Sequence, residues 1–303
     1  MDGVLIIDKP AGPTSHDVVA RVRRALGIRR IGHTGTLDPL ATGVLPLVVG
    51  RATRLASLLS HAEKAYDAGV RLGAATDTYD ASDRTGPPPE PPAAIDVEQI
   101  DRALARFRGT FDQSPPAYSA KKIAGVAAYT LARRHTPVQP RAVPVTVGQL
   151  ALKSYDHGLA RLHVTASAGF YVRSLAHDLG RELGCGAYLE TLRRNRAGAF
   201  REEASIALHA VEVEGAAAAR WIVPLDSLLP HVPVLMLNQR GARRAAHGNE
   251  LGPEDLVDPS SLPVRGETES SEARWRLFDS GGMLVGIAES RTGGLLHPVI
   301  VLV

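Results

Sequence analysis

The order of the apolar segments restricts the fold of this chain more than any other feature. Five segments have the short apolar runs or the alternating pattern of β-strands, namely residues 3–7, 44–49, 66–72, 145–152 and 159–166. Strands and helices do not alternate regularly along the chain, as they would in a doubly wound parallel sheet. The sequence therefore predicts the α+β class, with a mixed, largely antiparallel sheet flanked by helices.

Capping residues indicate where the helices lie. Thr14 and Ser15 can cap a helix whose apolar positions keep near-helical spacing up to Gly27. Asp96 can cap a second helix that ends before Gly109. A third helix is predicted at residues 174–183, and all three are expected to lie beside the sheet.

The length of the chain, 303 residues, allows two domains, or one large domain with an appendage. Near the C-terminus, strand-like segments lie on either side of a turn at residues 279–282. We predict a first domain at residues 1–230 and a small β-rich domain at residues 231–303. The proline-rich residues 83–94 and the Ser-, Pro- and acid-rich residues 258–272 are predicted to be long loops or linkers.

Several protein classes are excluded by residues that the chain lacks. The single cysteine, Cys185, excludes a disulfide framework and a multi-cysteine zinc site within the chain, and it suits a reducing compartment. Residues 1–10 have no basic segment before their apolar run, so they do not form a secretory signal. The strongest apolar stretch, residues 44–49, is too short to span a membrane. We expect a soluble, cytoplasmic protein without membrane association.

Basic residues are concentrated in the N-terminal part of the chain. The total charge is only +3, but residues 1–230 hold 28 basic and 23 acidic residues, against 7 and 9 in the remainder. Residues 18–37 contain five arginines and no acidic residue; these are Arg21, Arg23, Arg24, Arg29 and Arg30. Such a stretch fits either a solvated helix face or a surface that binds phosphates.

Residues 32–43, with the sequence GHTGTLDPLATG, are predicted to form a structured loop. Glycines allow tight turns and close approach to a ligand, and Pro39 restricts Asp38 to extended backbone geometry. Neighbouring arginines would keep the Asp38 carboxylate ionised. From the residues alone, Asp38 is a nucleophile, a base or a structural anchor. The loop lacks the motifs of P-loop and dinucleotide-binding proteins, and the chain has neither a Gly-x-Ser-x-Gly motif nor paired histidines with metal spacing.

The loop resembles the catalytic motif of the bacterial TruB family of tRNA pseudouridine synthases. Other segments resemble that family in the same order along residues 3–196; they are residues 3–14, Lys64-Ala-Tyr66, Thr76-Asp77-Thr78, residues 115–121 continuing to Ala132-Arg133, Tyr171-Val-Arg173 with residues 176–180, and Leu192-Arg-Arg194. Phe170 departs from the family pattern, in which a threonine is common at this position. The resemblance implies a pseudouridine synthase domain at residues 1–230.

The resemblance implies that uridine 55 in the TΨC loop of tRNA is isomerised to pseudouridine. The family needs no cofactor and no metal, and Asp38 would be its catalytic carboxylate, acting on a flipped-out uridine. Three routes stay open: attack of Asp38 on C1′ of the ribose, addition to C6 of uracil, and assistance in forming a glycal. A secondary tRNA-folding activity is also expected.

The resemblance also implies roles for residues around Asp38. His33 would fill the space that the base leaves, and Tyr66 would stack on the uracil and relay a proton at C5. Arg173 would pair with Asp38 and keep it ionised. Tyr171 and Leu192 would line the base pocket, although a leucine alone is more often a core residue.

Contacts with the RNA are expected from basic residues and from the tail. The candidates for phosphate contacts are Lys9, Arg21, Arg24, Arg29, Arg30 and Lys121. Residues 231–303 resemble a PUA-like RNA-binding domain. The expected partner is the T-arm stem-loop of tRNA, and the protein is expected to be a monomer without an obligate protein partner. Two alternatives are an RNA-binding module whose pocket is incidental and a carboxylate-dependent phosphohydrolase; the latter lacks a second metal-binding Asp near Asp38.

Overall fold

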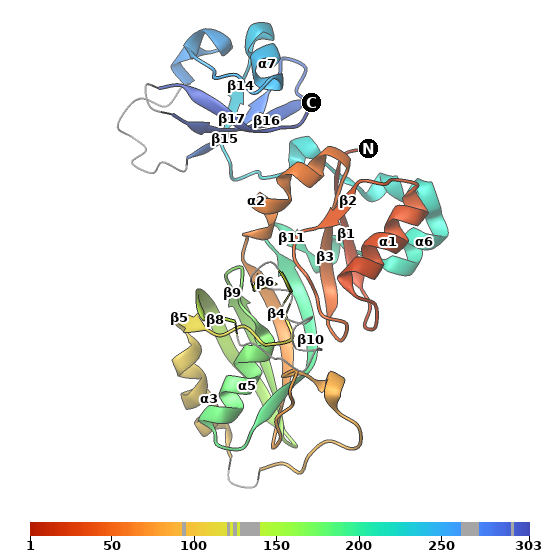
Figure 1. Ribbon diagram of the computed structural model, residues 1–303, viewed down its shortest axis with the longest axis vertical. Helices are drawn as coiled ribbons and strands as arrows, with labels where there is room; N and C mark the ends of the chain where they lie inside the picture. Colours follow the sequence, from red (N-terminus) through yellow and green to blue (C-terminus); the bar gives the residue numbers. More distant parts are fainter. Residues whose placement is uncertain (93–94, 120–121, 124–125, 128–139, 262–272, 292–293) are drawn as a thin grey trace.

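The fold consists of a large sheet, a small sheet and a short hairpin, with helices packed beside them. The computed structural model describes residues 1–92, 95–119, 122–123, 126–127, 140–261, 273–291 and 294–303. Within these ranges the strands form one 11-stranded sheet, one 4-stranded sheet and one 2-stranded sheet. Figure 1 shows the 4-stranded sheet at one end of the molecule, beyond the larger sheet. Among the described residues, none of the helices is both long enough and apolar enough to span a membrane.

The large sheet has a mixed but mainly antiparallel topology. Its strands follow the order β12-β1-β3-β10-β4-β9-β8-β5, while β11, β13 and β2 pair with β10, β1 and β3. Only the β1–β12 and β10–β3 pairs are parallel. The strands are β1 (Gly3–Lys9), β2 (Ile31–His33), β3 (Thr42–Val49), β4 (Lys64–Leu72), β5 (Gly109–Gln113), β8 (Val143–Asp156), β9 (Leu159–Ala166), β10 (Ala187–Ala197), β11 (Phe200–Arg201), β12 (Ile206–Ala207) and β13 (Val223–Pro224). The predicted α+β class and the five predicted strands are confirmed.

The central strand β10 is absent from the sequence prediction. It lies between β3 and β4, yet its sequence contains Glu190 and a run of basic residues. These charged side chains find partners: Glu190 pairs with Arg71, and Arg193 pairs with Asp8. Arg194, in contrast, is bound by backbone carbonyls. Because these partners come from other parts of the fold, the strand can carry charged residues and lacks the apolar pattern by which strands are recognised.

The predicted helices are present, with small changes at their ends. Helix α1 (Ser15–Leu26) has a capping box between Thr14 and Asp17 and ends at Gly27, whose φ is 68°. Helix α3 (Val97–Leu104) is capped by Asp96 and continues as a 3₁₀ turn to Phe107. Helix α5 (Val172–Glu182) begins earlier than predicted. The other α-helices of the described residues are α2 (Ala56–Ser60), α6 (Leu208–Glu214) and α7 (Gln239–Ala246).

Apolar side chains form three clusters. The largest lies between one face of the large sheet and helices α1, α3, α5 and α6. A second cluster joins the two sheets, because Val4, Ile6, Val44 and Val48 of β1 and β3 pack with side chains such as Phe278 from the C-terminal unit. The third lies inside that unit.

The C-terminal unit contains the predicted hairpin. Its strands are β14 (Val234–Met236), β15 (Arg274–Phe278), β16 (Leu284–Ser290) and β17 (Leu296–Val301), and the separate short hairpin is β6 (Lys122–Ile123) with β7 (Val126–Ala127). A turn closed by hydrogen bonds between Asp279 and Met283 and between Gly282 and Asp279 joins β15 to β16. The last strand of the large sheet ends at Pro224 and the first strand of the small one begins at Val234; the domain division at residue 230 stays a prediction.

We expect Gly180→Ala to destabilise the fold. A Cβ atom at Gly180 would lie 2.1 Å from the backbone nitrogen of Ala187, where α5 contacts the start of β10. The backbone must shift to relieve this overlap, at a cost of about 1–3 kcal/mol in the free energy of unfolding. Urea denaturation measures the loss. The control Glu182→Ala removes only a surface ion pair with Arg106 and should cost under about 1 kcal/mol; equal losses for the two variants would contradict this packing.

Candidate active site

The loop that carries Asp38 connects β2 to β3 and is tied to the start of the chain. The Ser15 hydroxyl donates to the carbonyl of Leu37 at 3.0 Å and accepts from its N–H at 2.8 Å. The Lys9 ammonium donates to the carbonyls of Ala41 at 2.7 Å and Pro39 at 3.3 Å. Residues on both sides of Asp38 are therefore fixed by buried side chains.

Arg194 fixes the beginning of the same loop and the start of β3. Its guanidinium is 1% exposed and donates to the carbonyls of Val44 at 2.7 Å and Gly35 at 3.1 Å. A side chain at Gly43 would collide with the backbone of Arg194, since a Cβ atom there would lie 2.3 Å from its carbonyl oxygen. Strand β10 thus packs directly against the Asp38 loop.

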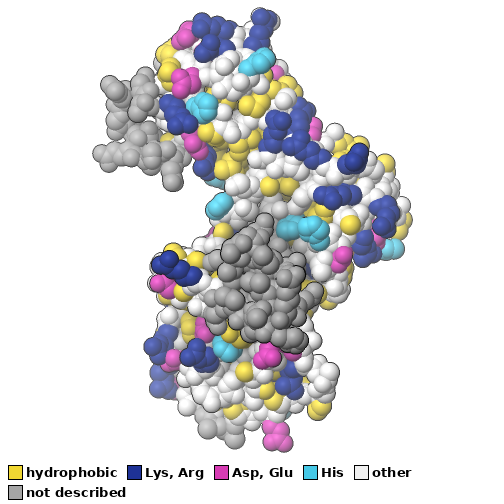
Figure 2. Space-filling view, in the orientation of Figure 1, with side chains coloured by type: hydrophobic (Ala, Val, Ile, Leu, Met, Phe, Trp, Pro, Cys, Tyr) yellow, Lys and Arg dark blue, Asp and Glu magenta, His cyan; other side chains and the backbone are white. Residues whose placement is uncertain are grey.

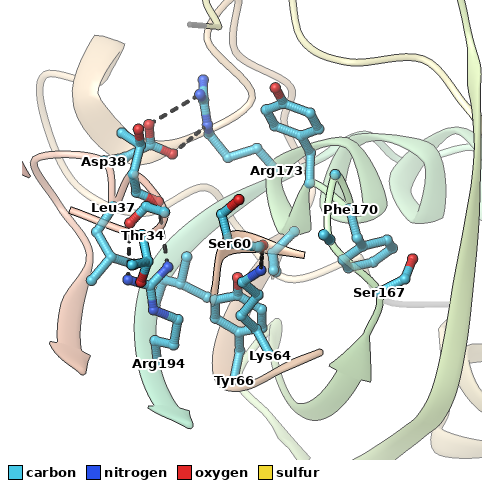
Figure 3. A pocket seen from close by; sticks show the side chains of 17 residues that line it. Thr34, Leu37, Asp38, Ser60, Lys64, Tyr66, Ser167, Phe170, Arg173 and Arg194 are labelled. Atoms are coloured by element: carbon cyan, nitrogen blue, oxygen red, sulfur yellow. Dashed lines mark hydrogen bonds and ion pairs between the residues drawn. The ribbon is translucent and has the colours of Figure 1, made fainter. Parts of the chain in front are cut away.

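Arg173, in the first turn of α5, forms an ion pair with Asp38 through both carboxylate oxygens. Its Nε lies 2.9 Å from Oδ2, and its Nη2 lies 3.2 Å from Oδ1 (Figure 3). The same guanidinium donates to the carbonyls of Thr78 at 2.9 Å and Tyr118 at 3.0 Å, and Asp80 lies 3.7 Å away. The Arg173 side chain is 6% exposed, whereas that of Asp38 is 32% exposed and so remains reachable. The geometry presents a fixed carboxylate.

A pocket of about 260 Å³ opens beside Asp38. Five of the six residues predicted to act on the substrate line it; they are Asp38, Tyr66, Tyr171, Arg173 and Leu192. Tyr66 comes from β4 and Leu192 from the neighbouring strand β10. The volume is slightly below the range of roughly 300–1,000 Å³ for small-molecule sites, so a single planar ring is the size of group that it suits.

Tyr171 is held at the end of the pocket by Gln113. The Tyr171 N–H donates to Gln113 Oε1 at 2.8 Å, and Gln113 Nε2 donates back to the Tyr171 carbonyl at 3.0 Å. Burial raises the pKa of the Tyr171 hydroxyl, which therefore stays protonated. Phe170, the residue that departs from the family pattern, also lines the pocket and is 9% exposed.

His33 lies at the end of β2, beside the loop and outside the residues that line the pocket. Its Nδ1 accepts from the N–H of Gly35 at 3.4 Å, and its ring meets His16 edge to face at 6.2 Å. Burial lowers the pKa of His33, and the charges of His16 and Arg194 lower it further. The imidazole is therefore neutral at neutral pH.

The basic residues predicted to contact phosphates differ in their burial and in their partners. The prediction for Lys9 is wrong, because its side chain is fully buried and its ammonium is bound to loop carbonyls. Burial lowers its pKa to about 8, against the attraction of Asp38. Arg21 is paired with an acidic side chain from another part of the chain, since it forms two hydrogen bonds with Glu212, at 2.6 and 2.8 Å.

The other predicted contacts are exposed or not described. Arg24 and Arg29 are exposed around a depression at the end of α1. Arg30 is exposed as well, and its Nε donates to the Thr53 hydroxyl at 2.6 Å. Figure 2 shows Lys and Arg side chains on the side of the molecule where Figure 1 has α1 and β2. Lys121 lies outside the described residues.

Sequence reasoning missed three buried charged residues around the pocket. Asp80 is 4% exposed and faces Arg173; Lys64 and Arg194 line the pocket wall and are 8% and 1% exposed. Each lies inside a segment that resembles the family or within a few residues of one, but nothing in the local pattern marks its side chain as buried. Among the residues that the structure describes, no group of three or more His, Cys, Asp or Glu side chains is arranged to hold a metal ion.

Comparison with known proteins identifies relatives over the whole chain. Residues 23–172 match the model described as TruB family pseudouridylate synthase (N terminal domain), and residues 173–230 match the tRNA pseudouridylate synthase B C-terminal domain. A protein of Solibacter usitatus named tRNA pseudouridine synthase B is 43% identical over 307 residues, covering 100% of both chains. One of the same name from Thermobifida fusca is 39% identical, covering 99% of this chain and 98% of the relative.

Solved structures share the fold as well. The Nop10-Cbf5 complex of the archaeal box H/ACA sRNP contains a chain with a TM-score of 0.71 and 25% identity, covering 99% of this chain and 86% of that one. An H/ACA RNP bound to a substrate RNA containing 2′-deoxyuridine gives a TM-score of 0.73 at 24% identity, covering 99% and 85%. Full-length identity of 39–43% to named members, together with the two family matches, establishes that the chain belongs to the TruB family of pseudouridylate synthases.

Proposed function

We propose that this protein converts uridine 55 in the TΨC loop of tRNA into pseudouridine, with Asp38 as the catalytic carboxylate. The broader activity, pseudouridine synthesis in tRNA, follows from the family and from relatives named tRNA pseudouridine synthase B. The observation that carries the assignment to Asp38 is its bidentate ion pair with Arg173 at the mouth of a pocket the size of one ring.

The reaction requires that the base leave C1′ of the ribose through N1, turn, and return through C5. Arg173 holds the Asp38 carboxylate in one orientation through both of its oxygens, so the carboxylate is positioned before the uridine arrives. Tyr66 stacks against the flipped uracil and relays the proton at C5, while Tyr171 and Leu192 retain the free ring. The same arrangement serves all three routes: attack at C1′, addition at C6 and glycal formation.

The uridine must leave its RNA loop to reach this pocket, at a cost of a few kcal/mol. His33, beside the pocket, fills the space that the base leaves. Exposed arginines at the end of α1 contact the phosphates and so contribute to the binding energy that offsets the cost. Residues 231–303, as a PUA-like domain, extend the contact along the tRNA, with neither a cofactor nor an obligate protein partner, and the protein acts as a monomer.

Arginines on α7 form a candidate contact surface in this C-terminal unit. Arg240 and Arg244 both lie within 3.3 Å of the fully buried Asp255. Asp255 partly neutralises the charge of both arginines, so we expect RNA to bind more weakly to this surface than to the arginines at the end of α1.

Asp38→Asn should abolish tritium release from tRNA labelled at C5 of uridine while leaving RNA affinity within about twofold, because the amide keeps the shape but loses the charge. Filter binding and tritium release measure the two properties. Asp67→Asn is the matched control, since Asp67 lies on β4 and is 59% exposed. Normal turnover by the Asp38 variant would show that another group performs the chemistry, and mapping of the modified nucleotide tests position 55.

Arg173→Lys should lower the single-turnover rate by on the order of 10²-fold, because a lysine cannot bridge both oxygens of Asp38 and the two carbonyls together. RNA affinity should be unchanged. Arg181→Lys, an exposed change on the same helix, should retain the wild-type rate. If the two variants have equal rates, the ion pair is dispensable for the reaction.

A second candidate function, RNA folding without chemistry, is favoured by the separation of the exposed arginines from Asp38. The double variant Arg24→Ala/Arg29→Ala should reduce the slope of log affinity against log salt concentration by about 2. It should also impair tRNA folding to the same extent whether residue 38 is the native Asp38 or carries the change Asp38→Asn. The control is Arg21→Ala/Glu212→Ala, which removes an ion pair without changing net charge. An unchanged salt slope in the first variant would exclude these arginines as phosphate contacts.

A further inference from the structure

Two buried cations converge beneath the Asp38 loop. Lys64 opens β4 and Arg194 lies in β10, with Arg194 paired to Tyr66 across the two strands. Both side chains line the pocket (Figure 3). They meet at Gly35, where a Cβ atom would lie 3.5 Å from Arg194 Nη1 and 3.8 Å from Lys64 Cε. Two like charges are thus held close together in the wall of the base pocket.

Neither cation has a carboxylate partner among the residues that the structure describes. Lys64 donates to the carbonyls of Ala62, at 2.6 Å, and Ser60, while Arg194 donates to carbonyls of the catalytic loop and β3. Arg173, in contrast, faces Asp38 and Asp80. Burying a charged group without an opposite charge costs free energy of folding, and this penalty applies to both Lys64 and Arg194. Burial and the nearby Arg194 lower the pKa of Lys64 to about 8, in agreement with this picture.

The proposed reaction generates an anion in this pocket, so the inference rests on the proposed function. When the N1–C1′ bond breaks, its electron pair stays on N1, and the base becomes a uracil monoanion with charge spread onto O2 and O4. Addition of Asp38 to C6 would likewise push charge onto the ring oxygens. The anion is consumed when C5 bonds to C1′, which on the direct-attack route replaces the bond from C1′ to Asp38 and releases the carboxylate. C5 then loses its proton to Tyr66, and N1 takes up a proton in place of its former bond to C1′. Asp38 offers no positive charge to this anion, since it is a carboxylate before it reacts and an uncharged ester while it is bonded to the ribose or the ring.

We propose that Lys64 and Arg194 form an anion-binding wall that stabilises the detached uracil. A lysine ammonium has three N–H donors, and Lys64 uses two of them on carbonyls, which leaves one for a ring oxygen. Lys64 contacts the base directly, whereas Arg194 contributes charge and keeps the loop in place. Such fixed charges act where negative charge develops and need no reorganisation during the reaction.

The direct test compares small molecules that bind without any turnover. Ligand-observed NMR titrates the full-length protein with barbiturate, a planar anion of uracil-like shape, with neutral uracil and with inorganic phosphate. We expect barbiturate to bind at least about tenfold more tightly than uracil, the effect of one charged hydrogen bond. Equal affinities would overturn the proposal. Phosphate binding that matches and competes with barbiturate would overturn it too, in favour of a site for the RNA backbone.

Two lysine variants test whether Lys64 causes the preference for barbiturate over uracil. Lys64→Met should remove the preference for barbiturate over uracil, and Lys153→Met, an exposed change on β8, should keep it. Lys64 could instead have a purely structural role, in which it binds the carbonyls at the end of α2. In that case Lys64→Met would lower the thermal stability and leave the preference for barbiturate over uracil intact, which would contradict the proposal. The comparison of ligands on the wild-type protein decides the question even if Lys64→Met does not fold.

Kinetics separate this inference from the proposed function. Lys64→Met should lower kcat on tRNA by on the order of 10²-fold and leave KM for the RNA unchanged, as expected for loss of an interaction made only during reaction. A higher KM with unchanged kcat would overturn the proposal. If the wild-type protein releases no tritium from tRNA, the proposed function fails, whereas the NMR titration still tests the anion site on its own.

Discussion

The ion pair between Arg173 and Asp38 is the interaction on which the active site depends. A single guanidinium at the start of α5 binds the Asp38 loop, the turn at Thr78 and the segment at Tyr118. These three segments are far apart in the sequence, and Arg173 joins them at the pocket. Because the guanidinium is nearly fully buried, its contacts are not weakened by water, and removal of any one partner leaves a buried charge or carbonyl unsatisfied.

Several buried cations surround the Asp38 loop. Lys9, Lys64 and Arg194 are all buried and donate mainly to backbone carbonyls. This arrangement holds the loop rigidly and raises the electrostatic potential of the pocket at the same time. Neutral donors could hold the same carbonyls without the cost of burying a charge. The charges themselves are what the proposed anion-binding wall would use.

The fold could be predicted where local chemistry determines it. Thr14 and Gly27 mark the ends of α1, because few residue types favour the N-cap position or the left-handed backbone of a C-cap. Strand β10 could not be predicted, since its charged side chains are bound by acidic groups and carbonyls that only the folded chain brings to them. For the same reason Lys9 and Arg21 were expected to be exposed cations, although one is buried against the loop and the other pairs with Glu212. Motif resemblance located the pocket residues, but it could not reveal burial.

The apolar cluster shared by the two sheets has a consequence for truncated forms of the protein. Strands β1 and β3 have one face in the main core and the other in the second cluster, to which Val4, Val44 and Phe278 all belong. Strand β3 follows the Asp38 loop, and Lys9 at the end of β1 donates to a carbonyl of that loop. Docking of the tail and order in these two strands are therefore thermodynamically linked: a chain cut after the large sheet would expose the apolar side chains of β1 and β3 that the C-terminal unit covers.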